Sequence, residues 1–144
     1  MAFLDKSELK TVGQIVIIDK IIANDDSIVD DIIAESIALM KGYLSRFYDA
    51  EAIFNAEGEN RHLAVLKKLK DIVIYEIYER HTREQNLVAQ RRFAEAMKWL
   101  EELNSGKQAD STLPVKPDDS SGGSIDGTSG DTRFGGNKRY TSIY

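Results

Sequence analysis

The chain has 144 residues, 42% of them hydrophobic, and its 19 Lys and Arg against 24 Asp and Glu give a formal net charge of −5. It has no cysteine, which excludes disulfides, thiolate metal sites and cysteine nucleophiles. The length predicts one domain, and the acidic balance argues against general binding to nucleic acid phosphates. The sequence shows neither a secretion signal nor an apolar run of membrane-spanning length, so we expect a protein made in the cytoplasm that does not enter a membrane.

Two short helices are expected first. Asp5 and Glu8 have the spacing of a capping box, which predicts that a short helix starts there. The next stretch, QIVIIDKII at 14–22, is ambiguous, because its Ile and Val run favours a strand while its apolar residues also fit one helical face. Since nothing else in the chain offers a pairing strand, we expect a helix.

A long amphipathic helix is expected within 24–49, with Ser27 as its cap and acidic residues in its first turn. Its apolar stripe consists of Ile28, Ile32, Ile33, Ile37, Met40, Leu44 and Phe47. Core packing is the expected role of this stripe. The aromatic cluster at the end of the helix fits either the edge of the core or an interface, and it consists of Tyr43, Phe47, Tyr48 and Phe54.

Two further helices complete the expected domain. Leu63, Leu66, Leu69, Val73 and Ile77 mark a helix from about Arg61 to Arg80. The capping-box pattern TREQ at 82–85 opens a last helix, which Gly106 is placed to end. The inward residues of that helix are Ala89, Phe93, Ala96, Met97, Leu100 and Leu103. The predicted fold class is all-α, a small bundle of three main helices and one or two short ones, followed by a long flexible C-terminal tail.

The composition changes sharply at LNSGKQAD, where Gly, Ser, Asp, Thr and both prolines replace the periodic apolar residues. We place the domain boundary at about Asn104, giving a helical domain of 1–103 and an extended tail of 104–144. The first part holds 14 Lys and Arg and 19 Asp and Glu, whereas the second holds 5 of each, so the acidity belongs to the domain.

Few residues suggest chemistry. Glu59 and His62 have the Glu-x-x-His spacing of dinuclear carboxylate sites, but the pattern occurs once and a solvated helix start is the better interpretation. The acids of DDSIVDD lack a calcium-loop arrangement, and SGGSIDGTSGD lacks the ending and flanks of a phosphate loop. The basic clusters LKKLKD and QRR fit solvated faces better than phosphate sites. We therefore expect no catalytic residue, cofactor or metal.

Several stretches resemble the phage head-tail connectors, the small head-completion or adaptor proteins of Mu-like phages and of Bacteroidetes phages and prophages. The resemblance covers roughly 3–115 and is carried by YLSRFYD at 43–49, IYEIYER at 74–80 and AMKWLEELNSGK at 96–107. The residues that match are structural, namely Tyr43, Leu44, Tyr48, Asp49, Trp99, Leu100 and Gly106. The chain departs from the family in the length of the segment between Gly106 and Arg133.

The resemblance implies a structural virion protein that is not an enzyme. Such a protein assembles as a ring, usually of twelve copies, below the portal at the capsid vertex. It extends the DNA channel without sequence-specific DNA binding and joins the capsid to the tail or to a second adaptor. The alternative that the residues leave open is a small helical DNA-binding or regulatory module that uses KKLK and QRR as its contact surface.

The chain ends in RFGGNKRYTSIY, a basic and aromatic stretch after a segment that is poor in apolar residues. A flexible linker of about 25 residues has a root-mean-square span of about 25–30 Å, enough to reach a neighbouring subunit or the portal. We expect 133–144 to dock on such a partner, against the alternative of a disordered end with chance aromatics. DNA binding by this stretch is the less favoured interpretation, because it has only three positive charges. The expected docking residues are Arg133, Phe134, Lys138, Arg139, Tyr140 and Tyr144.

Overall fold

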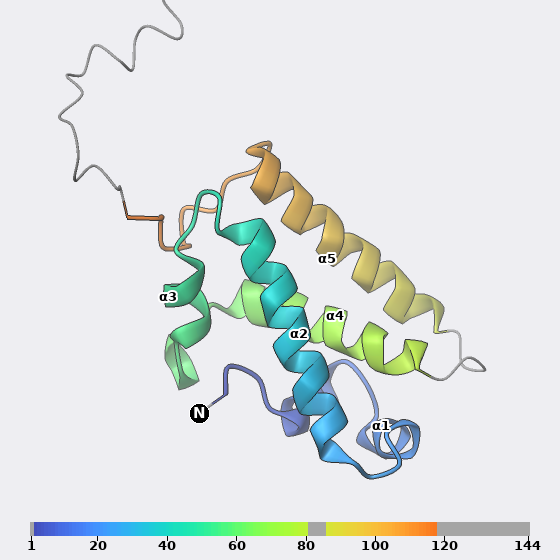
Figure 1. Cartoon of the computed structure of the whole chain (residues 1–144). Helices are drawn as coiled ribbons and strands as arrows, with labels where there is room; N and C mark the ends of the chain where they lie inside the picture. Colours follow the sequence, from blue (N-terminus) through green and yellow to red (C-terminus); the bar gives the residue numbers. More distant parts are fainter. Residues whose placement is uncertain (1, 81–85, 118–144) are drawn as a thin grey trace, which may run out of the picture.

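The structure, a computed structural model, describes residues 2–80 and 86–117 (Figure 1). Three long helices form the body of the domain: α2 (Asp26–Leu44), α4 (Leu63–Glu79) and α5 (Leu87–Ser105). The short elements are the 3-10 helices η1 (Lys6–Thr11) and η2 (Gly58–Asn60) and the helices α1 (Ile15–Ile21) and α3 (Ala50–Asn55). Within these described ranges there is no strand, and the predicted all-α bundle is confirmed.

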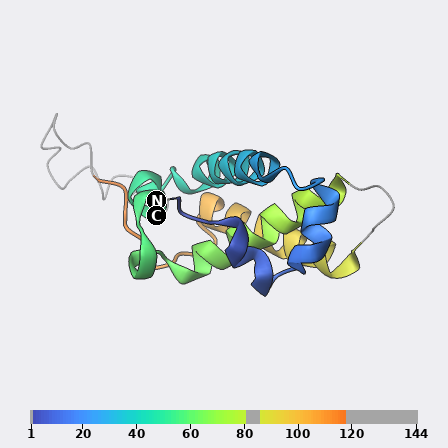
Figure 2. The ribbon, with the colours of Figure 1, turned by 90° about the horizontal axis from the view of Figure 1, so that it is seen from below.

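Helix α4 is the centre of the bundle, and both α2 and α5 pack against it. In Figure 2, α2 runs along one side of α4, and η1 packs beside the start of α2, where Lys6 and Asp26 form an ion pair. Neighbouring elements cover more than one face of α4, and apolar residues accordingly occur on most of its faces. The buried ones are Val65, Leu66, Leu69, Ile72, Val73, Ile74, Ile77 and Tyr78. A helix that is apolar on most faces belongs in the interior, so α4 holds the core together.

The N-terminal segment is fixed to the start of α4 by a bidentate ion pair. The predicted capping box is present, and the Asp5 amide donates to Glu8 Oε2 at 3.0 Å. Arg61 donates to both carboxylate oxygens of Glu8, at 3.0 and 2.9 Å, and also to the Phe3 carbonyl at 2.8 Å. This guanidinium holds the pKa of Glu8 below its usual range.

Helix starts differ from the sequence expectation in two places. The cap of α2 is Asp25, whose side chain accepts from the Ser27 amide, so the expected cap Ser27 is wrong. Both residues are good acceptors, and the chain uses the earlier one. Helix α4 begins at Leu63 with His62 as its cap, two residues after the expected Arg61. The helical form of α1 is confirmed, because Ile15–Ile21 is an α-helix with Ile18 buried.

The start and end of α5 are set by an amide and a glycine. The expected capping box at 82–85 lies outside the described residues, and the described helix begins at Leu87 with Asn86 as its cap. The Asn86 side chain accepts from the amides of Val88 and Ala89. Gly106 ends the helix as predicted, in the left-handed conformation with φ of 80°. None of the described helices is long and apolar enough to cross a membrane.

Candidate partner-docking site

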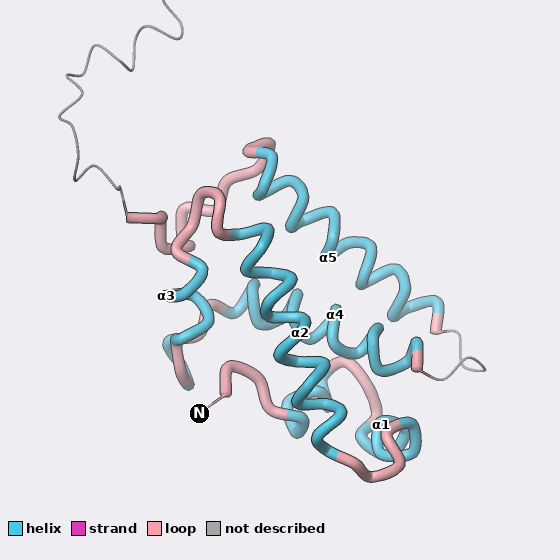
Figure 3. Tube along the Cα trace, viewed as in Figure 1, coloured by secondary structure: helices cyan, strands magenta, loops and turns pink. Residues whose placement is uncertain are grey.

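The residues that follow α5 cross back over the domain. We call 106–117 the strap, and Figure 3 shows it running beside the connection between α2 and α3. The strap is anchored by Leu113, which is only 2% exposed and belongs to the core. The tail expected from Asn104 onward therefore has its first part, as far as Pro117, in contact with the helical domain.

The backbone of the strap pairs with the α2–α3 connection. The Asp49 amide donates to the Pro114 carbonyl at 2.9 Å, and the Lys116 amide donates to the Phe47 carbonyl at 3.2 Å. Between them, Tyr48 and Val115 form an isolated antiparallel bridge. These bonds satisfy backbone groups that the end of α2 would otherwise leave to water.

Tyr48 and Asp49 have the central roles in this contact. Tyr48 is buried, and its hydroxyl accepts a hydrogen bond from the Asp110 amide at 3.1 Å. The Asp49 side chain accepts from the Ala52 amide at 3.0 Å and so caps α3. One aromatic residue thus holds the strap while its neighbour starts the next helix.

The end of α5 packs on the same connection. A methyl group on Gly106 would lie 3.8 Å from the Phe47 ring, so the glycine and the ring are adjacent. The Arg46 guanidinium lies 4.9 Å from the centroid of that ring and donates to the Asn104 carbonyl at 3.0 Å. This arrangement joins the end of α5 to the end of α2.

A polar cluster fixes the middle of the strap to the start of α4. His62 Nδ1 accepts from the Val65 amide at 3.4 Å, and Nε2 lies 2.6 Å from Thr112 Oγ1. Thr112 donates its hydroxyl and its amide to the Asp110 carboxylate. These two bonds hold the pKa of Asp110 below its usual range, and the nearby His62 acts in the same direction.

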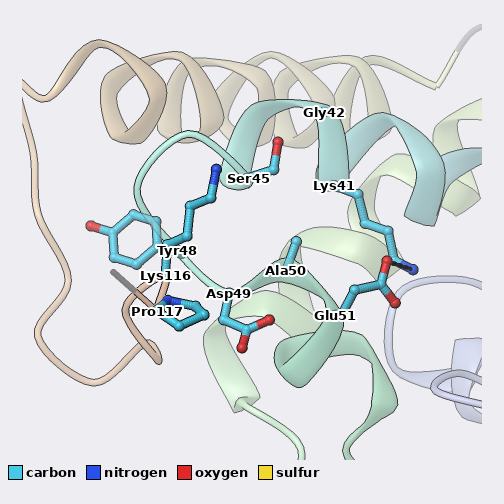
Figure 4. A pocket seen from close by; sticks show the side chains of 9 residues that line it. All are labelled: Lys41, Gly42, Ser45, Tyr48, Asp49, Ala50, Glu51, Lys116 and Pro117. Carbon is cyan, nitrogen blue, oxygen red and sulfur yellow. Dashed lines mark hydrogen bonds and ion pairs between the residues drawn. The ribbon is translucent and has the colours of Figure 1, made fainter. Parts of the chain in front are cut away.

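Two hollows flank the strap. The first, of about 450 Å³, lies between the end of α2 and the start of α3; Figure 4 shows Lys116 extending toward Ser45 on one side and Lys41 paired with Glu51 on the other. The second, of about 470 Å³, has Phe47 and Val115 on its rim, with 42% and 73% of their surface exposed. Tyr48 lines both hollows. Exposed apolar rims beside fixed backbone suit binding of a partner segment.

The structure brings together only some of the residues that the sequence singled out. Tyr48, Asp49 and Gly106 meet at the strap. Leu44 and Leu100 are buried in the core, and Tyr43 and Trp99 pack half-buried against it. Within the aromatic cluster, Phe54 is also buried, while Phe47 is exposed. The expected docking residues Arg133, Phe134, Lys138, Arg139, Tyr140 and Tyr144 lie outside the described residues.

The Glu-x-x-His pair is part of a helix start. Glu59 lies exposed in η2, and His62 caps α4. Among the residues that the structure describes, no three His, Asp or Glu side chains are grouped so as to hold a metal ion.

Sequence reasoning missed a third hollow, which joins the two basic clusters. It measures about 390 Å³ and is lined by Thr11, Val12, Leu63, Leu66, Lys67, Lys70 and Arg92. Each cluster alone looked like a solvated face. Only the packing of α4 against α5 places their cations around one depression.

Comparisons of the chain with family models, curated proteins and solved structures give no match.

Proposed function

We propose that this protein is a structural component of a phage particle, a head-tail connector that forms a ring below the portal. In this role the ring extends the DNA channel and joins the capsid to the tail or to a second adaptor. The ring has about twelve copies by the family resemblance, and DNA passes through it without sequence-specific binding. The end of the chain, 133–144, docks on a neighbouring subunit or on the portal.

The observation that supports this proposal most is the strap. The stretches that resemble the connector family, YLSRFYD and the end of AMKWLEELNSGK, converge on one end of the bundle. There the strap is fixed by backbone pairing and by buried Leu113 before the chain continues past Pro117. A tail that continues from a fixed point on a rigid domain loses less conformational entropy on docking than a tail that continues from a loose segment.

The test is complex formation with the portal protein of the same phage, followed by native mass measurement and electron microscopy. Three chains are compared: the full chain, a chain stopped after Pro117, and a full-length chain with Phe134→Ser, Tyr140→Ser and Tyr144→Ser. Stopping after Pro117 keeps the strap, so the domain stays intact. We expect the full chain to stack as a ring on the portal, and both variants to bind more weakly.

The two parts of the proposal fail separately. If no chain associates with the portal, the connector function is refuted. If all three chains bind equally, the connector function stands and docking by 133–144 is refuted. The substituted full-length chain separates loss of the aromatic side chains from loss of chain length.

One observation favours a second candidate, a small helical DNA-binding or regulatory module. The hollow between α4 and α5 gathers Lys67, Lys70 and Arg92, which belong to the clusters that such a module would use. A gel-shift assay with duplex DNA at low and moderate salt tests it. DNA binding that weakens steeply with salt and is lost in Lys70→Gln/Arg92→Gln would favour the module over the connector.

A further inference from the structure

The hollow between α4 and α5, which we call the basic hollow, is positively charged on an otherwise acidic chain. Its charged lining consists of Lys67, Lys70 and Arg92, and no acidic side chain lines it. Lys67 is partly neutralised by the buried Asp71, at 3.4 Å. Lys70 lies 3.3 Å from the Thr11 hydroxyl, and neither Lys70 nor Arg92 forms an ion pair within the part of the chain described.

The basic hollow also has an apolar part. Leu66 lines its interior, and Leu63, with 76% of its surface exposed, stands at the first turn of α4. The hollow therefore combines an exposed leucine with Lys70 and Arg92, and the charge of Lys70 also acts on Glu8. It suits a partner that presents carboxylates next to an aliphatic side chain.

Helix α2 presents such a surface on its outer face. Asp30, Asp31 and Glu35 are exposed there, and none of them forms an ion pair with another described residue. One turn beyond Glu35, Leu39 has 40% of its surface exposed. We call this the acidic face of α2.

Negative charge is in excess around the acidic face. Burial raises the pKa of Glu76 on α4, and the charges of Glu79 and of Glu35 raise it further. Glu35 therefore lies close enough to Glu76 for their like charges to repel. Cations brought by a partner would relieve this repulsion.

We propose that the acidic face of α2 in one copy docks in the basic hollow of a second copy. The carboxylates of Asp31 and Glu35 meet Lys70 and Arg92, and Leu39 packs near Leu63. This inference rests on the proposed ring and names the surfaces that join its subunits.

The placement of the two surfaces makes the contact head-to-tail. The element η1, which supplies Thr11 to the basic hollow, packs against the start of α2 through the Lys6–Asp26 ion pair, whereas Asp31, Glu35 and Leu39 lie farther along α2. The basic hollow and the acidic face share no residue. A single copy can therefore use both surfaces at once. A contact between unlike surfaces propagates from copy to copy, and it closes into a ring when the rotation between copies allows.

Each such contact is modest, because exposed charge pairs contribute more to association rate and specificity than to affinity. Closure of a ring adds avidity, since the last contact forms within one assembly. Weak individual contacts and a stable ring are compatible for this reason.

Charge reversal tests the contact in the full chain. One variant, Lys70→Glu/Arg92→Glu, reverses the hollow, and another, Asp31→Lys/Glu35→Lys, reverses the acidic face. Sedimentation velocity at low salt measures self-association. We expect each variant to associate about tenfold more weakly or worse than the native chain.

Recovery of self-association by compensating substitutions is the decisive part of the experiment. Mixing the two variants, or combining all four substitutions in one chain, recreates opposite charges at the contact and should recover association. The matched control for the hollow variant, Lys20→Glu/Lys107→Glu, makes the same change in net charge as that variant at exposed positions outside both surfaces, and it should associate like the native chain. Helical circular dichroism confirms that each variant is folded, and Lys70→Gln/Arg92→Gln provides a milder pair for the hollow.

Three results would overturn the proposal: a native chain that is monomeric at its highest soluble concentration, reversal variants that associate normally, or a mixture that shows no recovery. Loss of DNA binding in the hollow variant with unchanged self-association would also overturn it and assign the hollow to DNA. Failure of this contact is distinguishable from failure of the proposed function, which is measured on the portal. Portal binding by variants that associate normally would leave the connector standing without this contact.

Discussion

Replacing Leu113 by alanine tests whether the strap belongs to the folded domain. The Leu113 side chain is 2% exposed and lies in the same core cluster as Tyr48. Truncation of a buried leucine costs about 2–5 kcal/mol, depending on how far the site relaxes. Since the strap lies at the edge of the domain and can shift toward the smaller side chain, we expect the low end of that range, about 2–3 kcal/mol.

The assay is thermal unfolding of the full chain, with urea unfolding as a second measure. For a domain of this size, each kcal/mol lowers Tm by about 4–8 °C, so Leu113→Ala should lower it by about 8–24 °C. Val115→Ala is the matched control, because Val115 lies on the same strap with 73% of its surface exposed. Surface truncations of this kind usually change stability by less than about 0.5 kcal/mol.

Hydrogen exchange localises the effect. The amides of Asp49 and Lys116 donate across the strap contact, so Leu113→Ala should speed their exchange more than that of amides within α4. If Leu113→Ala and Val115→Ala unfold at the same temperature and the two amides exchange as in the native chain, the packing of the strap is refuted.

Three further substitutions test single positions. Gly106→Ala should destabilise the domain by about 1–2 kcal/mol in urea unfolding, because its φ of 80° is unfavourable for a side chain. Gly42→Ala, in an exposed helical position with no atom near the added methyl, should instead stabilise by about 0.5–1 kcal/mol, and equal effects would contradict this reasoning. Glu8→Gln removes a carboxylate whose pKa is lowered by Arg61, so the stability lost should be about 1–2 kcal/mol near neutral pH. That difference should shrink as the pH falls below the ordinary carboxyl pKa and through the lowered one, because the native Glu8 then becomes protonated; a pH-independent difference would refute the charge origin.

The sequence predicts the bundle well because the long helices carry strong local signals. The apolar period of α2, α4 and α5 is sustained over several turns, and Gly106 supplies a stop signal that the backbone uses. Helix starts are less certain when two acceptors compete, as Asp25 and Ser27 do at the start of α2. The choice depends on how the chain enters the helix, which the local sequence does not specify.

The strap could not be predicted from the same kind of signal. It lies in a polar segment with two prolines, and its one buried residue, Leu113, has no periodic neighbours. Its bonds go to the distant residues Phe47, Tyr48 and Asp49, so only the folded bundle makes them available. The one local hint is the Asp-x-Thr pattern at 110–112, whose side-chain bonds make a turn.

The basic hollow could not be predicted from the sequence for a related reason. Lys67 and Arg92 belong to different helices, and each cluster carries too few charges to indicate a site alone. The packing of α4 against α5 places them around one depression, while Asp30, Asp31 and Glu35 remain exposed on α2. The net charge of −5 therefore does not reveal these two surfaces, because the positive charge of the basic hollow and the negative charge of the acidic face are summed within it.

The strap also changes how the end of the chain must be studied. A cut after Lys107 would remove Leu113 and the backbone pairing at the α2–α3 connection, so weaker portal binding would follow from damage to the domain alone. A cut after Pro117 leaves these contacts in place and removes only what lies beyond them. Since Lys116 and Pro117 line the hollow beside α3, a partner bound there would contact the strap and the domain together. Binding at this hollow and docking by 133–144 are therefore separable: substitutions at Lys116 should affect the first even in the chain that stops after Pro117, whereas only the longer chain can report the second.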